Sequence, residues 1–273
     1  MHLNDDRVSD ADAGRLLNAV LDAGVNLIDT ARGYGLSEER IGRHIAHRRN
    51  DYVLSTKVGY GIPDFQDWTY DCIVAGVDAA LARMHTDVLD IVHLHSCPLH
   101  VLQQGDVVRA LEDCQQRGKL RVVAYSGDEA ELRWAIDSGR FGSVQTSVSV
   151  CDQANLRQHL RVAQAHNVGV IAKRPLAGAV WRFAKRSDDF AEGQYWDRFQ
   201  AMGIDPAGLD WAELALRFAA FAPGVASAIV GTKTPENFLR NVAIVAQGPL
   251  PASQQAGITA AFASHNQGWA SLI

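Results

Sequence analysis

Four side chains suited to proton chemistry lie at or near the ends of three successive apolar runs. Asp29, Lys57 and His95 each end such a run, and Tyr34 follows Asp29 in the next loop. A phenol normally titrates near ~10, but a neighbouring ammonium group favours the phenolate and lowers the pKa. We therefore expect Asp29 to hold Lys57 charged beside Tyr34, and His95 to hydrogen-bond a substrate oxygen. This combination fits a general acid for a carbonyl that becomes an alcohol as hydride arrives from a cofactor.

Each of these residues also has an ordinary explanation when it is taken alone. Asp29 suits a turn, Tyr34 suits packing, and Lys57 suits a solvated loop charge. Together these explanations are weak, because a buried lysine or aspartate at a strand end is costly unless it is paired. The side chains meet only if the runs are parallel strands whose ends open onto one face.

The pattern along the chain predicts such an arrangement. Apolar runs typical of strands alternate with amphipathic helical segments through short connections, which indicates parallel strands joined by crossovers. No GxGxxG turn follows the first run, so an α/β barrel of the TIM type is favoured over an open dinucleotide-binding sheet. Residues 181–208 form the longest irregular stretch, a candidate functional loop. The seven predicted strands end near Asp29, Lys57, His95, Ser126, Val150, Arg174 and Thr232.

Composition limits the class of protein. With 47% hydrophobic and 21% charged residues over 273 positions, the chain is typical of a globular protein, and we expect a single domain over 1–273. A net charge of −5 provides no broad basic surface for nucleic acid or an anionic membrane. The polar, acidic first residues predict no signal peptide, and no apolar run is long enough to span a membrane. The four dispersed cysteines predict reduced thiols, which favours a cytoplasmic protein.

The segment GVNLIDTARGYGLSEERIG (24–42) resembles the signature of the aldo-keto reductase family. The resemblance continues in family order through STKVG, DIVHLHSCP, RVVAYSG, SVQ, VIAKRPLAG and AIVGTKTPENFLRN. It implies a (β/α)8 barrel that binds NADP(H) without a metal. It also implies that Asp29, Tyr34, Lys57 and His95 are the catalytic tetrad, with Tyr34 as the proton donor to a carbonyl or sugar-like small molecule.

The same resemblance implies where the cofactor binds. Gln145 matches a nicotinamide-binding position, and Lys233 favours NADPH over NADH, since it lies near a helix N-terminus that suits a phosphate. Arg174 replaces the usual aromatic residue over the nicotinamide, and a guanidinium plane can also stack on a ring. Gly127 replaces the asparagine that usually follows the serine at 126. The full set of expected cofactor positions is Ser126, Gln145, Arg174, Leu176, Gly231, Thr232, Lys233, Asn237 and Asn241.

The family usually begins with a strand that this sequence does not show. HLNDDRV is short and acidic, whereas a buried parallel strand is a nearly continuous apolar run. We therefore expect seven strands, with two ladder edges unpaired where the barrel would close. This expectation fits three arrangements: an open barrel, a partner chain in the gap, or a truncated start. The sequence does not decide whether the chain forms a homo-oligomer.

Two other functions compete with the reductase. The missing strand and the altered nicotinamide contacts favour a catalytically weak, reductase-like subunit for cofactor binding or assembly. His93 and His95, on one face of a strand, are typical of barrel hydrolases that bind zinc. Such a site needs further ligands from later strand ends, where serine, arginine and threonine stand instead, so we expect no metal.

Overall fold

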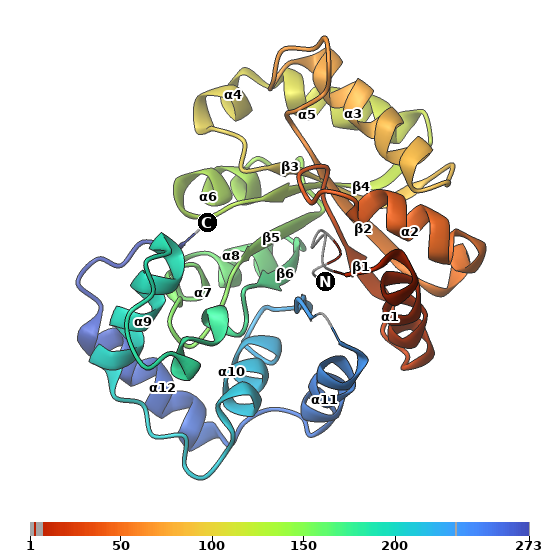
Figure 1. Ribbon diagram of the computed structural model, residues 1–273. Helices are drawn as coiled ribbons and strands as arrows, with labels where there is room; N and C mark the ends of the chain where they lie inside the picture. Colours follow the sequence, from red (N-terminus) through yellow and green to blue (C-terminus); the bar gives the residue numbers. More distant parts are fainter. Residues whose placement is uncertain (1–2, 4–7, 233, 273) are drawn as a thin grey trace.

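A computed structural model describes residues 3, 8–232 and 234–272, and its centre is one curled sheet of seven parallel strands (Figure 1). The strands follow one another in chain order around the sheet, which confirms the barrel-type α/β fold with seven strands. Within the described residues, β1 pairs only with β2 and β7 pairs only with β6, so both edges are free. The strands are β1 (Leu27–Asp29), β2 (Val53–Val58), β3 (Leu89–His95), β4 (Leu120–Ser126), β5 (Ser143–Ser147), β6 (Gly169–Lys173) and β7 (Ser227–Ala228).

Helices surround the outer face of the sheet (Figure 1). Within the described part of the chain, none is long and apolar enough to cross a membrane. The α-helices are α1 (Asp10–Asp22), α2 (Ser37–Ile45), α3 (Tyr70–Arg83), α4 (Leu99–Gln104), α5 (Asp106–Gln116), α6 (Glu129–Asp137), α7 (Ala154–Gln158), α8 (Leu160–Ala165), α9 (Phe190–Met202), α10 (Trp211–Ala220), α11 (Pro235–Ala246) and α12 (Ala252–His265). Two short 3-10 helices are η1 (Ala46–Asp51) and η2 (Ala177–Arg182).

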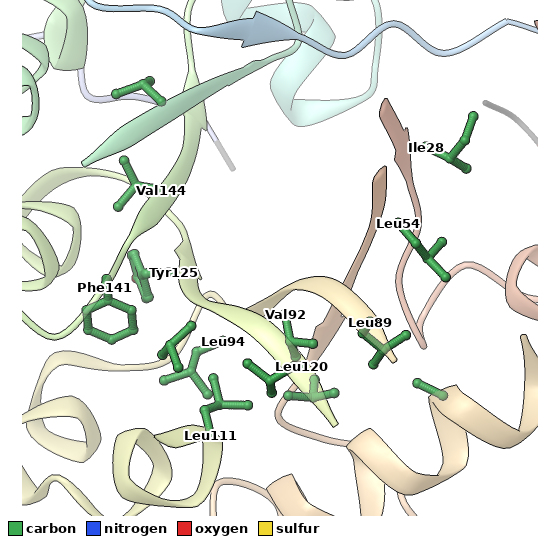
Figure 2. Packing of buried hydrophobic residues seen from close by; sticks show 14 of the residues in the cluster. Ile28, Leu54, Leu89, Val92, Leu94, Leu111, Leu120, Tyr125, Phe141 and Val144 are labelled. Carbon is green, nitrogen blue, oxygen red and sulfur yellow. The ribbon is translucent and has the colours of Figure 1, made fainter. Parts of the chain in front are cut away.

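Alternation along the strands separates an apolar layer from a polar interior. Side chains on a strand point alternately to its two faces. The outward positions pack against the helices, and Figure 2 shows Leu54, Val92 and Leu94 in this layer with Leu111 of α5. The inward positions are in register across neighbouring strands, where Asp29 pairs with Ser55, Lys57 with His93, and His95 with Ser126. The register therefore gathers the predicted catalytic side chains inside the sheet.

The free edges are bridged by helices rather than by a strand ladder. Helix α1 contacts α11 next to the gap between β1 and β7 (Figure 1). Phe238 of α11 packs against the same apolar cluster that contains Leu16 and Val20 of α1. Side-chain packing between these helices thus links the first strand to the last part of the chain.

Several element boundaries differ from the sequence prediction. Strand β5 ends at Ser147 rather than near Val150, because Ser149 and Asp152 pair with each other in a local turn. Strand β6 ends one residue before Arg174, and β7 ends four residues before Thr232. The prediction that residues 181–208 are irregular is wrong in part, since they contain α9. Helix α12 was not predicted.

Gly42 lies where α2 approaches α3 closely, and a substitution there tests this packing. A methyl group at Gly42 would lie 2.2 Å from the backbone oxygen of Arg83, so the two helices would have to separate. We expect Gly42→Ala to lower the free energy of unfolding by about 1–3 kcal/mol, the usual cost of overpacking. Urea unfolding measures the change.

Gly257 in α12 is the matched control. A methyl group there would meet nothing within 4 Å, so only helix propensity acts. Gly257→Ala should raise the free energy of unfolding by up to about 1 kcal/mol. Equal effects of the two substitutions would contradict the close packing of α2 on α3.

Candidate active site

The sheet opens onto a large cleft lined by residues from β1 and β3 through β7. Its volume is about 1930 Å³, larger than the roughly 300–1,000 Å³ of a typical small-molecule pocket. Asp29, Tyr34 and His95 all line this cleft, and Lys57 lies directly behind Asp29. The structure therefore brings together the four residues predicted from the strand ends.

A buried ion pair joins the first two strands at the base of this group. Lys57 Nζ lies 2.6 Å from Asp29 Oδ2, and the two side chains are only 1% and 6% exposed. The ammonium group also donates to the backbone oxygen of Thr30 at 2.7 Å. Each charge thus meets an opposite charge or a polar group, which offsets part of the cost of burial.

The second carboxylate oxygen of Asp29 anchors a hydrogen-bonded chain across the interior. Ser55 Oγ donates to Asp29 Oδ1 at 2.9 Å, and Gln145 Nε2 donates to the same oxygen at 3.0 Å. Ser126 Oγ then donates to Gln145 Oε1 at 3.2 Å. Burial acts to raise the pKa of Asp29, but the charge of Lys57 and the hydrogen bonds from Lys57 and Ser55 hold it below its usual value.

Tyr34 presents its ring to this ion pair and its hydroxyl to the cleft. Lys57 Nζ lies 5.1 Å from the centre of the Tyr34 ring. Within the described residues, no hydrogen bond to the Tyr34 hydroxyl is present. Burial raises the pKa of Tyr34 to about 12, Asp29 adds to the rise, and Arg174 opposes it. The expectation of a lowered pKa for Tyr34 is wrong, because the cost of burying the phenolate outweighs the positive charge nearby.

The two histidines of β3 are held neutral by burial. Desolvation lowers the pKa of His95 to about 4, and the positive charges of Lys57 and Lys173 act in the same direction. The same cause lowers the pKa of the fully buried His93 to about 3. Near neutral pH both rings are therefore uncharged, and each can donate from one nitrogen and accept at the other.

The expected cofactor positions lie along the cleft, apart from Lys233, which lies outside the described residues. Gln145 keeps one amide hydrogen and one oxygen lone pair free after its bonds to Asp29 and Ser126. Asn237 and Asn241 lie on α11, whose N-terminus is capped by the hydroxyl of Thr234. The positions that line the cleft are Ser126, Gln145, Arg174, Leu176, Gly231, Thr232, Asn237 and Asn241.

The glycine at 127 has a structural cause. A side chain there would lie 2.3 Å from the hydroxyl oxygen of Tyr125, which is buried and donates to the backbone oxygen of Cys97 at 3.3 Å. The phenol of Tyr125 therefore occupies the room that a larger residue would need.

Two cationic side chains, Lys173 and Arg174, stand at the end of β6, and the sequence prediction assigned a cofactor contact only to Arg174. Lys173 pairs with the buried Asp128 at 2.8 Å, so its charge is compensated. Arg174 has a φ of 56°, an uncommon conformation for a residue with a side chain. The positive charge of Arg174 acts to lower the pKa of both Tyr34 and Tyr195, so its guanidinium group lies near both phenols.

Comparison with known proteins agrees with this arrangement. The model of the aldo/keto reductase family matches residues 1–262. This chain belongs to the aldo/keto reductase family.

Two curated members of the family show the extent of the similarity. L-galactose dehydrogenase of Arabidopsis thaliana is 29% identical over 182 residues, which span 62% of this chain and 57% of that protein. The uncharacterised oxidoreductase YqkF of Bacillus subtilis is 25% identical over 247 residues, 83% of this chain and 80% of the relative. The match with the plant enzyme thus covers little more than half of that enzyme's length.

A solved structure supports the fold of this family member. The holo form of an aldo-keto reductase from Bacillus halodurans superposes with a TM-score of 0.83 at 24% identity. The superposition covers 93% of this chain and 88% of that one.

The metal alternative lacks a set of ligands. The described part of the chain contains no group of three or more His, Cys, Asp or Glu side chains that could hold a metal ion. His93 Nε2 instead lies 3.1 Å from the hydroxyl of Ser55, inside the polar network.

The sequence interpretation missed three members of this network. Ser55 stands two positions before Lys57, so strand alternation alone could have placed it on the inner face. Asp128 follows β4 and could have been flagged as a buried partner for Lys173. Tyr60 forms a hydrogen bond with His95. No pattern in the sequence predicts this contact, because it depends on the path of a loop.

Because His93 and His95 are held neutral, the free energy of unfolding of this aldo/keto reductase family member should depend on pH. Unfolded histidines bind protons near ~6.5, whereas His93 and His95 do so only near 3 and 4. The unfolded state therefore binds more protons between about pH 4 and 6.5, and these residues lower stability as the pH falls through that window. Asp152 has the opposite sign, because burial raises its pKa to about 6.

We expect His93→Gln to lose less stability than wild type when the pH falls from 6.5 to 4.5. The difference should be about 2 kcal/mol, because each pKa unit corresponds to about 1.4 kcal/mol. Urea unfolding at the two pH values measures it, and His100→Gln, which changes an exposed histidine, serves as the control. An equal loss in wild type and His93→Gln would refute the buried, neutral state of His93.

Proposed function

We propose that this chain is an NADP(H)-dependent aldo-keto reductase that reduces an aldehyde or ketone, or oxidises the matching alcohol or sugar. The observation that carries the proposal is the meeting of Asp29, Tyr34, Lys57 and His95 at one cleft, with the Tyr34 hydroxyl open to it. Family membership supports the class of reaction, and the size of the cleft leaves room for a cofactor and a substrate together.

Tyr34 acts as the proton donor in this proposal. Its raised pKa keeps the phenol protonated at neutral pH, so the acidic form that carbonyl reduction needs is present before the reaction. As the proton moves to the carbonyl oxygen, negative charge develops on the phenol oxygen. Lys57, beside the ring, and Arg174, which lowers the pKa of the phenol, stabilise that charge.

His95 and Asp29 prepare the site without giving up a proton. His95 is neutral and lines the cleft beside Tyr34, with ring centres 6.0 Å apart and an edge-on angle of 85°. The imidazole can therefore donate a hydrogen bond to the oxygen that receives the proton of Tyr34. Asp29 keeps Lys57 charged and in place.

The cofactor contacts follow from the residues along the cleft. When bound, a nicotinamide cofactor supplies the hydride. Gln145 would offer its free amide hydrogen and lone pair to the carboxamide, with Ser126 beside it, and Arg174 and Leu176 would contact the nicotinamide ring. Gly231, Thr232, Lys233, Asn237 and Asn241 hold the adenosine end, where the N-terminus of α11 favours a phosphate. Lys233 adds a positive charge that favours NADPH.

The substrate class is a small carbonyl compound or a sugar. The similarity to L-galactose dehydrogenase supports a sugar-like substrate. Trp181 and Tyr195 line the cleft and offer apolar surface to the non-reacting part of the substrate. We propose that the protein acts in the cytoplasm on such a soluble substrate.

Substitution of the proton donor tests the proposal. Purified protein mixed with NADPH and a panel of aldehydes and sugars should oxidise the NADPH, which is followed as a loss of nicotinamide absorbance. NADH should support a slower rate. Tyr34→Phe should lower kcat by about 100-fold or more, since positioned acids usually contribute 10²–10⁴-fold. NADPH binding, followed by fluorescence, should stay unchanged. Turnover that survives in Tyr34→Phe would exclude Tyr34 as the donor.

A matched control and the alternatives share the same assay. Tyr70 lies on α3 and donates to Asp113 at 2.6 Å, so Tyr70→Phe removes a hydroxyl outside the cleft and should keep full activity. Binding of NADPH without turnover of any substrate would favour the subunit for cofactor binding or assembly. Loss of activity with a chelator would favour the metal-dependent hydrolase.

A further inference from the structure

Tyr60 makes a contact with His95 that the proposed catalytic roles do not use. Its hydroxyl oxygen lies 2.8 Å from His95 Nδ1, and the two rings stack with centres 5.5 Å apart and an interplanar angle of 22°. The described lining of the cleft includes His95 but not Tyr60. Tyr60 therefore makes its hydrogen bond to the site through the imidazole, and it lies close enough to Tyr34 for the two phenols to interact electrostatically.

The other nitrogen of the His95 ring is available to a ligand. Within the described residues, His95 Nε2 has no hydrogen-bond partner, whereas Nδ1 is engaged by Tyr60. Because His95 lines the cleft beside Tyr34, we infer that Nε2 is the nitrogen that meets a substrate oxygen.

The loop after β2 fixes the position of the Tyr60 ring. Trp68 packs edge-on against Tyr60, with ring centres 5.8 Å apart, and its backbone N–H donates to Gly59 O at 2.8 Å. Gly59 has a φ of 148°, and a methyl group there would lie 2.2 Å from the Trp68 ring. Gly61 N donates to Asp67 Oδ1 at 2.9 Å and closes the same loop. The phenol is thus held against His95 by several contacts that do not involve the cleft.

A neutral imidazole carries its single N–H on either nitrogen, and its partners decide which one. When Tyr60 donates to Nδ1, the proton resides on Nε2, which then donates into the cleft. In the opposite arrangement Nδ1 donates to the phenol oxygen, and the lone pair on Nε2 faces a carbonyl oxygen and repels it. A phenol is a good donor, and the first arrangement leaves both groups hydrogen-bonded once a carbonyl is present.

We propose that Tyr60 is a positioning residue that holds His95 as the Nε2–H tautomer, and so sets the hydrogen bond donated to the substrate's carbonyl oxygen. The role in substrate binding rests on the proposed reductase function. The tautomer itself is a property of the protein without substrate, so it can be tested separately.

Nitrogen NMR tests the tautomer directly. Long-range ¹H–¹⁵N correlation spectra of protein labelled with [¹⁵N]histidine, at pH 7.5, distinguish the two tautomers, and His95→Gln identifies the signal of His95. We expect the Nε2–H pattern in wild type and a mixture of both tautomers in Tyr60→Phe, which keeps the stacked ring and loses only the hydroxyl. Tyr70→Phe should keep the wild-type pattern. An Nδ1–H pattern in wild type, or an unchanged pattern in Tyr60→Phe, would overturn the proposal.

Kinetics test whether the tautomer matters for the reaction. Loss of one hydrogen bond should lower kcat/KM for carbonyl reduction by about 3- to 10-fold in Tyr60→Phe. In a His95→Gln background the same substitution should have no further effect, because its target is gone. Fully additive losses would show that Tyr60 acts independently of His95 and would refute the proposed role. If the wild-type protein reduces no carbonyl compound, the proposed function fails. The NMR result alone then decides whether Tyr60 sets the tautomer of His95.

Discussion

The buried ion pair between Asp29 and Lys57 is the constraint around which the interior is organised. Two charges removed from water are stable only with good geometry and further hydrogen bonds. Lys57 meets this demand through Asp29 and the backbone of Thr30, and Asp29 meets it through Ser55 and Gln145. These partners come from β2, from β5 and from the residue that follows β1. The pair therefore requires these strands to keep one register, and the same register exposes Tyr34 and His95 to the cleft.

Burial acts in opposite directions on the acids and bases around this pair, with one common result. It raises the pKa of Tyr34 and Tyr60, which are neutral when protonated, and lowers that of His95, which is neutral when deprotonated. Tyr34, Tyr60 and His95 are thus uncharged near neutral pH, while Asp29 and Lys57 compensate each other and Arg174 adds a positive charge at the cleft. A neutral carbonyl meets hydrogen-bond donors with little competing charge, and negative charge forms only as the proton leaves Tyr34.

The sequence predicted that Asp29, Tyr34, Lys57 and His95 lie together, because this meeting depends on two simple rules, strand alternation and the common direction of parallel strands. Other features depend on information that a local pattern lacks. The lowered pKa expected for Tyr34 is wrong, because burial of the phenol raises its pKa. Helix α9 was missed although Asp189 caps its first turn and Gly203 follows its last, because its apolar residues define no clear face. The contact of Tyr60 depends on a loop whose path is fixed by Trp68 and two glycines.

The two halves of the proposed site lie on either side of the open edge of the sheet. The proposed catalytic group comes from β1 to β3 and the loop after β1, whereas Asn237 and Asn241 come from α11, after β7. The strand ladder connects these halves only the long way round, through β4, β5 and β6. The short connection is the contact of α1 with α11, and Phe238 of α11 packs against the main apolar core, to which Leu16 and Val20 of α1 belong. The distance between the reacting end and the adenosine end of the proposed cofactor site therefore depends on apolar contacts between two helices. Such contacts are less directional than a ladder of hydrogen bonds and tolerate small shifts.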